Sequence, residues 1–117
     1  YGIDAPESKQ AFGQKAKQAL TTAIATKIVT VIDHGTDIYG RMLGTIWLDG
    51  YDINASMVDS GYAWVYRFED NAIVPGYIKY ESAAQKEAKG LWADTNPVPP
   101  WQWRQANEKP RKVKGKK

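Results

Sequence analysis

The segment Ile3-Asp4-Ala5-Pro6-Glu7 (IDAPE) places a carboxylate on each side of a proline. Pro6 fixes its own φ angle and disfavours helix at the residue before it, so the segment should be extended as a strand ends. Such a segment can direct both carboxylates into one cleft, where one binds a metal ion and the other accepts a proton from water. Taken alone, however, these residues favour a simple turn before a helix, with Asp4 or Glu7 bonded to backbone amides.

Hydrophobic periodicity outlines the rest of the domain. Apolar residues recur at spacings of three and four after Phe12, and two later stretches are rich in β-branched residues. The expected elements are a helix over residues 12–26, strands over 27–35 and 42–50, a short helix over 52–61, an aromatic strand over 62–67 and a helix over 76–90. The short helix can be capped by Asp52 or Asn54 and should end at Gly61.

The connecting segments are polar or rich in proline. We expect loops over residues 36–41 and 68–76, because each combines polar residues with glycine. The run Asn-Pro-Val-Pro-Pro over residues 96–100 should exclude helix. Two strong strands do not make a stable sheet alone, so the sheet of this domain should need further strands.

Length and composition indicate one globular domain. The chain has 117 residues, of which 43% are apolar and 25% charged. The absence of cysteine excludes thiol nucleophiles, disulfides and zinc–thiolate sites. The sequence contains no run of 18 apolar residues, so we expect no membrane span.

Charge is distributed unevenly along the chain. Residues 104–117 hold seven Lys or Arg side chains and one acidic residue, whereas the other 103 residues hold nine basic and twelve acidic side chains. We therefore divide the chain into a domain over residues 1–103 and a basic, disordered tail over residues 104–117. The tail suggests a polyanionic partner, and a solubilising chain end explains it equally well.

A second candidate stretch is Asp37-Ile38-Tyr39-Gly40-Arg41. Gly40 lets the backbone bend and present the guanidinium of Arg41, whose planar fork suits a phosphate. Tyr39 can stack on a base or direct its hydroxyl at a phosphate. By itself the stretch favours a β-turn with a solvated arginine.

The remaining candidates are one histidine and the aromatic residues. His34 lies where a predicted strand meets a turn, a position that favours a polar surface role over catalysis. Trp92, Trp101 and Trp103 are expected to pack within the domain, because indole rings bury large areas. Tyr66 remains open to either role, since it lies where an aromatic strand runs into a loop.

Together these motifs resemble the staphylococcal nuclease family. The resemblance covers about residues 1–104, and the order and spacing of its pieces make it specific although each piece is short. The pieces are IDAPE, FGQKAKQAL, DIYGR followed by LG and IWLDG, GYAWVY, EAKGLW, and the PPWQWR end typical of many bacterial members.

The resemblance implies an α+β OB-fold, a five-stranded Greek-key barrel with three helices. It implies a calcium-dependent endonuclease that hydrolyses DNA and RNA with little sequence preference. Asp4 and the backbone carbonyl of Ala5 would bind Ca²⁺, and Glu7 would act on the attacking water and contact the metal through it.

The substrate residues follow from the same resemblance. Arg41 would bind the scissile phosphate and Tyr39 the nucleotide. Tyr66 falls near the position of a second nucleotide-binding tyrosine, although the loop that follows it differs in length from the family pattern.

Family members carry three strands before the segment that matches residues 3–7. Those strands supply another calcium carboxylate and a second phosphate-binding arginine. We therefore expect an incomplete barrel whose sheet edge is bare or is paired with another chain, as in a homo-oligomer or a strand-swapped dimer. We also expect the chain as given to have little nuclease activity.

The alternative is a nucleic-acid or protein binding module of the OB type without catalysis. The presence of Asp4, Glu7 and Arg41 together favours the nuclease, since a pure binding module does not need this trio. Bacterial relatives are often exported, so secretion or a periplasmic location is the expectation for localisation.

Overall fold

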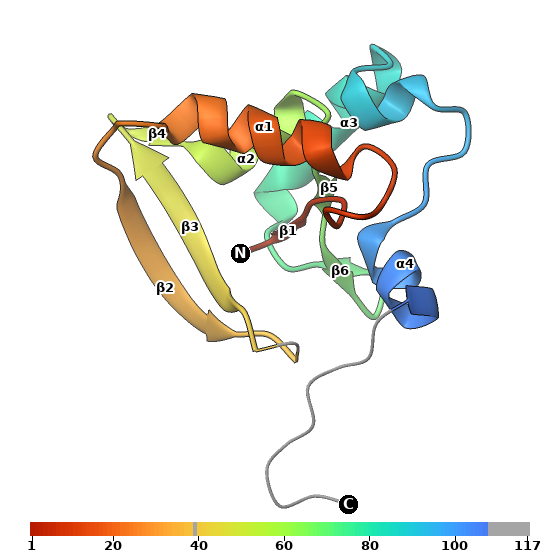
Figure 1. Ribbon diagram of the computed structural model, residues 1–117, viewed down its shortest axis with the longest axis horizontal. Helices are drawn as coiled ribbons and strands as arrows, with labels where there is room; N and C mark the ends of the chain where they lie inside the picture. The colour runs from red at the N-terminus through yellow and green to blue at the C-terminus, as the bar shows by residue number, and fades with distance from the viewer. Residues whose placement is uncertain (39, 108–117) are drawn as a thin grey trace, which may run out of the picture.

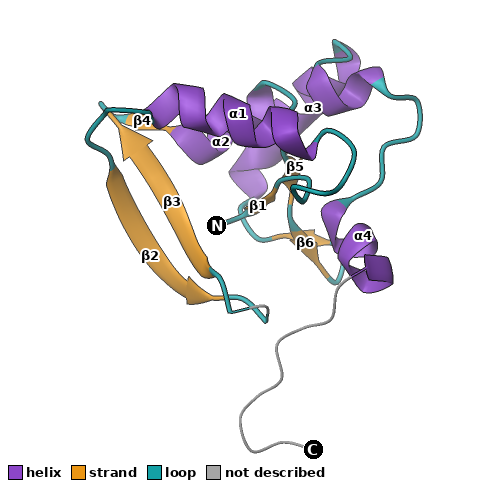
Figure 2. Ribbon diagram, in the orientation of Figure 1, coloured by secondary structure: helices purple, strands orange, loops and turns teal. Residues whose placement is uncertain are grey.

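The computed structural model describes residues 1–38 and 40–107, which form a mixed α+β fold (Figures 1 and 2). The α+β class predicted from the sequence is confirmed. In chain order the elements are β1 (Ile3–Asp4), α1 (Gly13–Ile24), β2 (Thr30–Thr36), β3 (Met42–Leu48), β4 (Tyr51–Asp52), α2 (Ile53–Asp59), β5 (Trp64–Val65), β6 (Arg67–Phe68), β7 (Asn71–Ala72), the 3-10 turn η1 (Pro75–Tyr77), α3 (Ile78–Lys86), the 3-10 turn η2 (Gly90–Ala93) and α4 (Pro100–Asn107). None of the described helices is long and apolar enough to cross a membrane.

The strands pair in three small antiparallel sheets, which are β1–β5, β2–β3–β4 and β6–β7. The described strands do not close into one barrel, in agreement with the expected incomplete barrel. The β2–β3 hairpin extends away from the helices (Figure 1), and all seven residues of β2 are exposed. β2 is thus an edge strand with a bare edge, and Val31 and Ile32 are 43% and 45% exposed on it.

The core lies where α2, β5 and η1 meet. Val58 of α2 and Val65 of β5 are fully buried, and α1 and β1 pack against the same cluster. The buried members of the cluster are Met57, Val58, Ala63, Val65 and Tyr77. β1 is fixed to this core because Ile3 pairs with Val65 and Asp4 pairs with Trp64. The start of the candidate motif is therefore held by the most buried strand.

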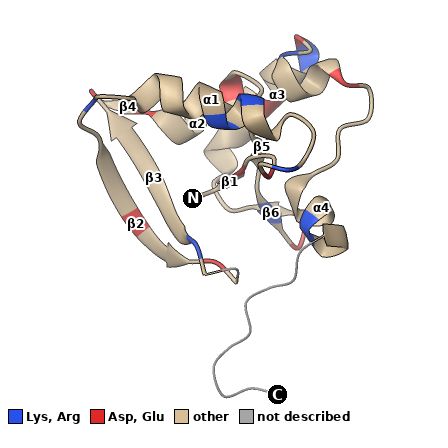
Figure 3. Cartoon of the chain, in the orientation of Figure 1, with Lys and Arg blue, Asp and Glu red and all other residues tan. Residues whose placement is uncertain are grey.

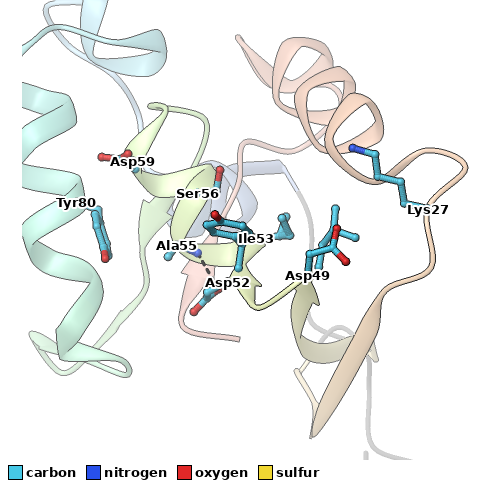
Figure 4. A pocket seen from close by; sticks show the side chains of 10 residues that line it. Lys27, Asp49, Asp52, Ile53, Ala55, Ser56, Asp59 and Tyr80 are labelled. Atoms are coloured by element: carbon cyan, nitrogen blue, oxygen red, sulfur yellow. Dashed lines mark hydrogen bonds between the residues drawn. The ribbon is translucent and has the colours of Figure 1, made fainter.

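Helix α2 begins at a cap that the sequence predicts. The Asp52 carboxylate accepts a hydrogen bond from the backbone N–H of Ala55 at 2.9 Å, on the wall of a shallow surface pocket (Figure 4). It also accepts one from the Tyr77 hydroxyl at 2.6 Å. Burial and this hydrogen bond raise the pKa of the Tyr77 phenol. The cap therefore connects α2 to the core.

The other proposed cap, Asn54, has a different role. Its buried side chain accepts from the N–H of Ile46 at 3.1 Å and donates to the carbonyl oxygens of Gly44 at 2.9 Å and Tyr1 at 3.1 Å. Asn54 thus joins α2 to β3 and to the segment before β1. This contact connects the hairpin with the rest of the domain.

Two parts of the sequence-based prediction are wrong. The expected loop over residues 68–76 contains β7, which pairs with β6 in a short hairpin. Residues 96–99 are not helical, as predicted, but the helix α4 begins at Pro100, so the described residues hold four α-helices and not the three that the resemblance implies. Pro100 is the first residue of α4, a position where its missing N–H removes no intrahelical bond.

Helix α4 also changes the predicted domain boundary. The boundary between residues 103 and 104 falls inside this helix, and Arg104 is only 5% exposed. Arg104 therefore belongs to the folded domain. Residues 108–117, the rest of the predicted tail over residues 104–117, lie outside the described residues.

A substitution at Gly61 tests the close approach between the chain just after α2 and the backbone of Lys89, which follows α3. Its φ angle is +81°, and an added Cβ would lie 2.4 Å from the carbonyl oxygen of Lys89. Gly50 has the same φ angle but nothing within 4 Å, so it is a matched control for backbone strain alone. We expect Gly50→Ala to lower the free energy of unfolding by about 1–2 kcal/mol, and Gly61→Ala by a further ~1–3 kcal/mol from overpacking. Urea denaturation measures both, and equal losses would contradict the close approach.

Candidate active site

The carboxylate pair is positioned by the end of β1. Asp4 is the last residue of this strand, and Pro6 is buried behind it, so the segment is extended as the sequence predicts. Glu7 begins a turn in which its carbonyl accepts from the N–H of Gln10 at 2.8 Å and its N–H donates to the Gln10 side-chain oxygen at 3.1 Å. Gln10 is itself buried and donates to the carbonyl of Val98 at 2.6 Å. The turn is therefore tied to the segment that leads into α4.

Arg104 of α4 binds both carboxylates. Its Nη1 donates to Asp4 Oδ1 at 3.0 Å and to Glu7 Oε2 at 2.6 Å, and its Nη2 donates to Asp4 Oδ2. The side chains of Arg104, Asp4 and Glu7 are only 5%, 13% and 14% exposed. A planar guanidinium can bridge two carboxylates in this way because it presents several donors in a fixed fork.

Arg41 approaches the same pair from the β2–β3 turn. Its Nη1 lies 3.3 Å from Glu7 Oε1 and 3.2 Å from Glu7 Oε2. Its Nε donates to Asp37 Oδ2 at 3.1 Å, and its backbone N–H donates to Asp37 Oδ1 at 2.9 Å. Asp37 thus holds the turn and aims the guanidinium, and charges of both signs meet there (Figure 3). The structure brings Asp4, Glu7 and Arg41 into one cluster through Arg104 and Glu7.

Burial and charge act against each other in this cluster. Burial raises the pKa of Asp4 above its usual range, and the hydrogen bond and charge of Arg104 oppose this shift without reversing it. Burial alone would lower the pKa of Arg104 and of Arg41, but the hydrogen bonds and charges of their carboxylate partners raise both pKa values overall. Both arginines are therefore cationic at neutral pH.

The cluster opens into a cleft of about 790 Å³. The cleft lies between β1, the β2–β3 turn, β6 and α4, and its walls include Asp4, Arg41, Tyr66, Phe68, Trp101 and Arg104. Tyr66 contacts Trp101 edge to face, with 6.0 Å between ring centroids, and its N–H donates to the carbonyl of Gly2 at 3.0 Å. Tyr66 thus lines the same cleft as Arg41, whereas Tyr39 lies outside the described residues.

The carboxylate pair does not fit a calcium ion as it stands. Carboxylate oxygens are hard ligands that suit Ca²⁺, but the ion takes six to eight of them. The described residues contain no group of three or more acidic, histidine or cysteine side chains that could hold a metal. All four oxygens of Asp4 and Glu7 accept hydrogen bonds from guanidinium groups. Ala5, whose carbonyl the resemblance assigns to calcium, is half-buried against the core cluster.

His34 lies on the surface, and Trp92 and Trp101 pack against Trp64, as the sequence favours. His34 is exposed on β2, where its Nε2 lies 3.1 Å from Thr45 Oγ1 and its ring stacks on Tyr1. Trp64 contacts Trp92 and Trp101 edge to face, with centroids 4.6 and 5.6 Å apart. These contacts seat η2 and α4 against β5.

Arg104 is the site residue that sequence reasoning missed. The charge count placed it in a basic tail, together with six other Lys or Arg residues. The available signal was the Trp-x-Trp-Arg motif, which resembles the family although the residues that follow it do not. Given more weight than the charge count, this motif would have placed Arg104 in the domain.

A comparison with protein families identifies the class of this chain. The model of the staphylococcal nuclease homologue family matches residues 1–94. Because this match covers most of the chain and the fold is α+β, the chain belongs to the staphylococcal nuclease family.

Several known proteins are similar to this chain. Protein ParB of Escherichia coli is 41% identical over 93% of the chain, and the micrococcal nuclease of Shigella flexneri is 38% identical over 91%. The probable staphylococcal-like nuclease CAN1 of rice (Oryza sativa subsp. japonica) is 42% identical over 88% of the chain. The chain spans 67% and 66% of the length of the two bacterial relatives and 30% of the rice protein.

The raised pKa of Asp4 has a consequence for stability. Because the folded chain holds this proton more tightly than the unfolded chain, the contribution of Asp4 to the free energy of unfolding is present at low pH and is lost as pH rises through the folded pKa. We expect a ¹³C NMR titration of the Asp4 carboxyl to show a midpoint above the ordinary aspartate value. The unfolding free energy of the parent minus that of Asp4→Asn should fall across the same pH interval. A midpoint below the ordinary value would mean that Arg104 outweighs burial.

Proposed function

We propose that this protein is a calcium-dependent phosphodiesterase that hydrolyses DNA and RNA with little sequence preference. The observation that supports this most directly is the contact between Arg41 and Glu7, which are 34 positions apart in sequence and meet at 3.2 Å. Arg41 lines the cleft, so this contact lies at its wall. A phosphate-binding fork beside a proton acceptor is what phosphodiester hydrolysis requires. Relatives named as an uncharacterised endonuclease and as a micrococcal nuclease support the same activity.

The two residues have separate roles in this proposal. Arg41 is 48% exposed, so its guanidinium can turn from Glu7 to the equatorial oxygens of a phosphate in the cleft. The Glu7 carboxylate then accepts a proton from the attacking water as the oxygen–phosphorus bond forms. The bond to the leaving oxygen breaks on the opposite side, and that oxygen takes a proton from solvent. Arg41 stabilises the charge that develops on the phosphate during this displacement.

The nucleotide is proposed to lie along the aromatic wall of the cleft. Tyr66 and Trp101 present ring faces and edges there, and aromatic side chains stack on any base. Stacking of this kind accounts for low sequence preference, because every base has a flat face. Tyr39 is proposed as a second nucleotide contact, on the resemblance alone.

Calcium is the proposed cofactor on the same basis. Asp4 and Glu7 supply oxygen atoms of the right kind, and bound Ca²⁺ would add positive charge beside the phosphate. Guanidinium groups occupy those oxygens in this structure, and the proposed roles of Arg41 and Glu7 do not require the metal.

Glu7→Gln tests the proton acceptor. The variant keeps the shape of the side chain but loses its basicity, so we expect a loss of about 10²–10⁴-fold in the rate of DNA cleavage. Glu87→Gln, which changes an exposed carboxylate on the chain after α3, is the matched control and should cleave at the parent rate. A fluorogenic single-stranded DNA substrate with excess protein measures these rates. An unchanged rate in Glu7→Gln would remove Glu7 from the chemistry.

Arg41→Lys tests the guanidinium fork. Lysine retains the charge but cannot bind two phosphate oxygens in one plane. We expect Arg41→Ala to lose about 10²–10³-fold in rate, and Arg41→Lys to recover only part of it. Full recovery in Arg41→Lys would show that charge alone is needed. Binding of DNA by the parent without cleavage would instead favour a binding module.

A further inference from the structure

We propose that Arg104 is an internal cation that competes with a divalent cation for the carboxylates of Asp4 and Glu7. The inference rests on the proposed function in one respect, which is that this pair receives the cation. It adds a residue of α4 to the site and gives that helix a role in controlling access to the pair.

The geometry leaves no room for both cations. Arg104 Nη1 lies 3.0 Å from Asp4 Oδ1 and 2.6 Å from Glu7 Oε2, and Nη2 binds Asp4 Oδ2. A calcium ion needs the same oxygen atoms at 2.3–2.6 Å. A guanidinium in contact with three of the four oxygens of the pair therefore excludes the ion until it moves.

The charges of the cluster also indicate that Arg104 and a divalent cation cannot occupy the site together. Asp4 and Glu7 carry two negative charges, which Arg104 balances together with Arg41, and Arg41 also contacts Asp37. A divalent cation added beside Arg104 would place like charges together where little water is present to screen them. The two cations are therefore alternatives. The three carboxylates of Asp4, Glu7 and Asp37 face two positive charges when Arg104 is in place and three when a divalent ion replaces it beside Arg41.

The two arginines differ in how easily they can leave. Arg41 is 48% exposed on a turn and can swing into solvent, whereas Arg104 is 5% exposed and belongs to α4. That helix is held by Trp101 against Trp64 and by the Gln10–Val98 hydrogen bond just before it. Movement of the Arg104 side chain away from the two carboxylates therefore weakens the packing of α4 against the rest of the domain. Cation binding and α4 docking are coupled, and by linkage each must weaken the other to the same extent.

The first test compares Ca²⁺ affinity in two arginine variants. Arg104→Gln removes the internal cation. Arg67→Gln is the matched control, because Arg67 also holds a buried carboxylate, with its Nη2 2.7 Å from Glu81 Oε1, but does not contact Asp4 or Glu7. Isothermal titration with calcium chloride at constant ionic strength should show the Kd of Arg104→Gln lowered by about 5–150-fold relative to the parent, and the Kd of Arg67→Gln unchanged. Equal or weaker binding by Arg104→Gln, or no binding by any of the proteins, would overturn the proposal.

The second test uses the parent chain and so does not depend on how a variant folds. Hydrogen exchange of the α4 amides is measured with and without calcium chloride at saturating concentration. We expect faster exchange in α4 when the ion is bound and unchanged exchange in α2. Bound calcium with unchanged protection of α4 would show that Arg104 stays in place, and the competition would be refuted.

These results separate the inference from the proposed activity. Suppose that Arg104→Gln binds Ca²⁺ more tightly and that the parent chain cleaves neither DNA nor RNA. This result would support the competition and reject the proposed nuclease activity. Cleavage that needs Glu7, with the same Ca²⁺ affinity in both arginine variants and the parent, would support the nuclease and reject the competition.

Discussion

Asp4 and Glu7 lie together beneath α4, and two neighbouring carboxylates can leave water only if cations accompany them. Arg104 is the cation that the fold supplies, and the arrangement of the nearby chain follows from this need. β1 must hold Asp4 against β5, the turn after Pro6 must aim Glu7 back towards it, and α4 must lie close enough to insert one guanidinium between them. Arg41, on the more exposed side, adds a second positive charge beside Glu7.

The cluster also explains why burial and charge are both needed here. Desolvation makes each electrostatic contact stronger than it would be on the surface, but it also penalises the charged form of Asp4. The arginines oppose that penalty without removing it. A site in this condition is sensitive to small changes in which cations are present, because each cation contributes a large share of the compensation.

The sequence predicted the parts of the site that depend on local pattern. Pro6 implied an extended segment at Asp4, Asp52 and Gly61 marked the ends of α2, and the β-branched runs gave β2 and β3. The meeting of Glu7 with Arg41 was expected from the family resemblance and not from either motif alone. The same local reasoning excludes helix correctly over residues 96–99 but not at Pro100, which begins α4. Charge counting failed for Arg104, since a composition average does not record that this side chain is buried.

The contacts that hold α4 against the domain join residues that are far apart along the chain. Arg104 and Asp4 are 100 positions apart, Arg104 and Glu7 are 97, and Gln10 and Val98 are 88. Ordering so long a loop costs chain entropy before any of these contacts can offset it, so such contacts form late in folding. During synthesis on a ribosome the two carboxylates emerge first and stay hydrated while α1, α2 and α3 are made. The site is therefore assembled by the arrival of α4, and a nascent chain that stops before this helix keeps the acidic pair in water without its buried counterion.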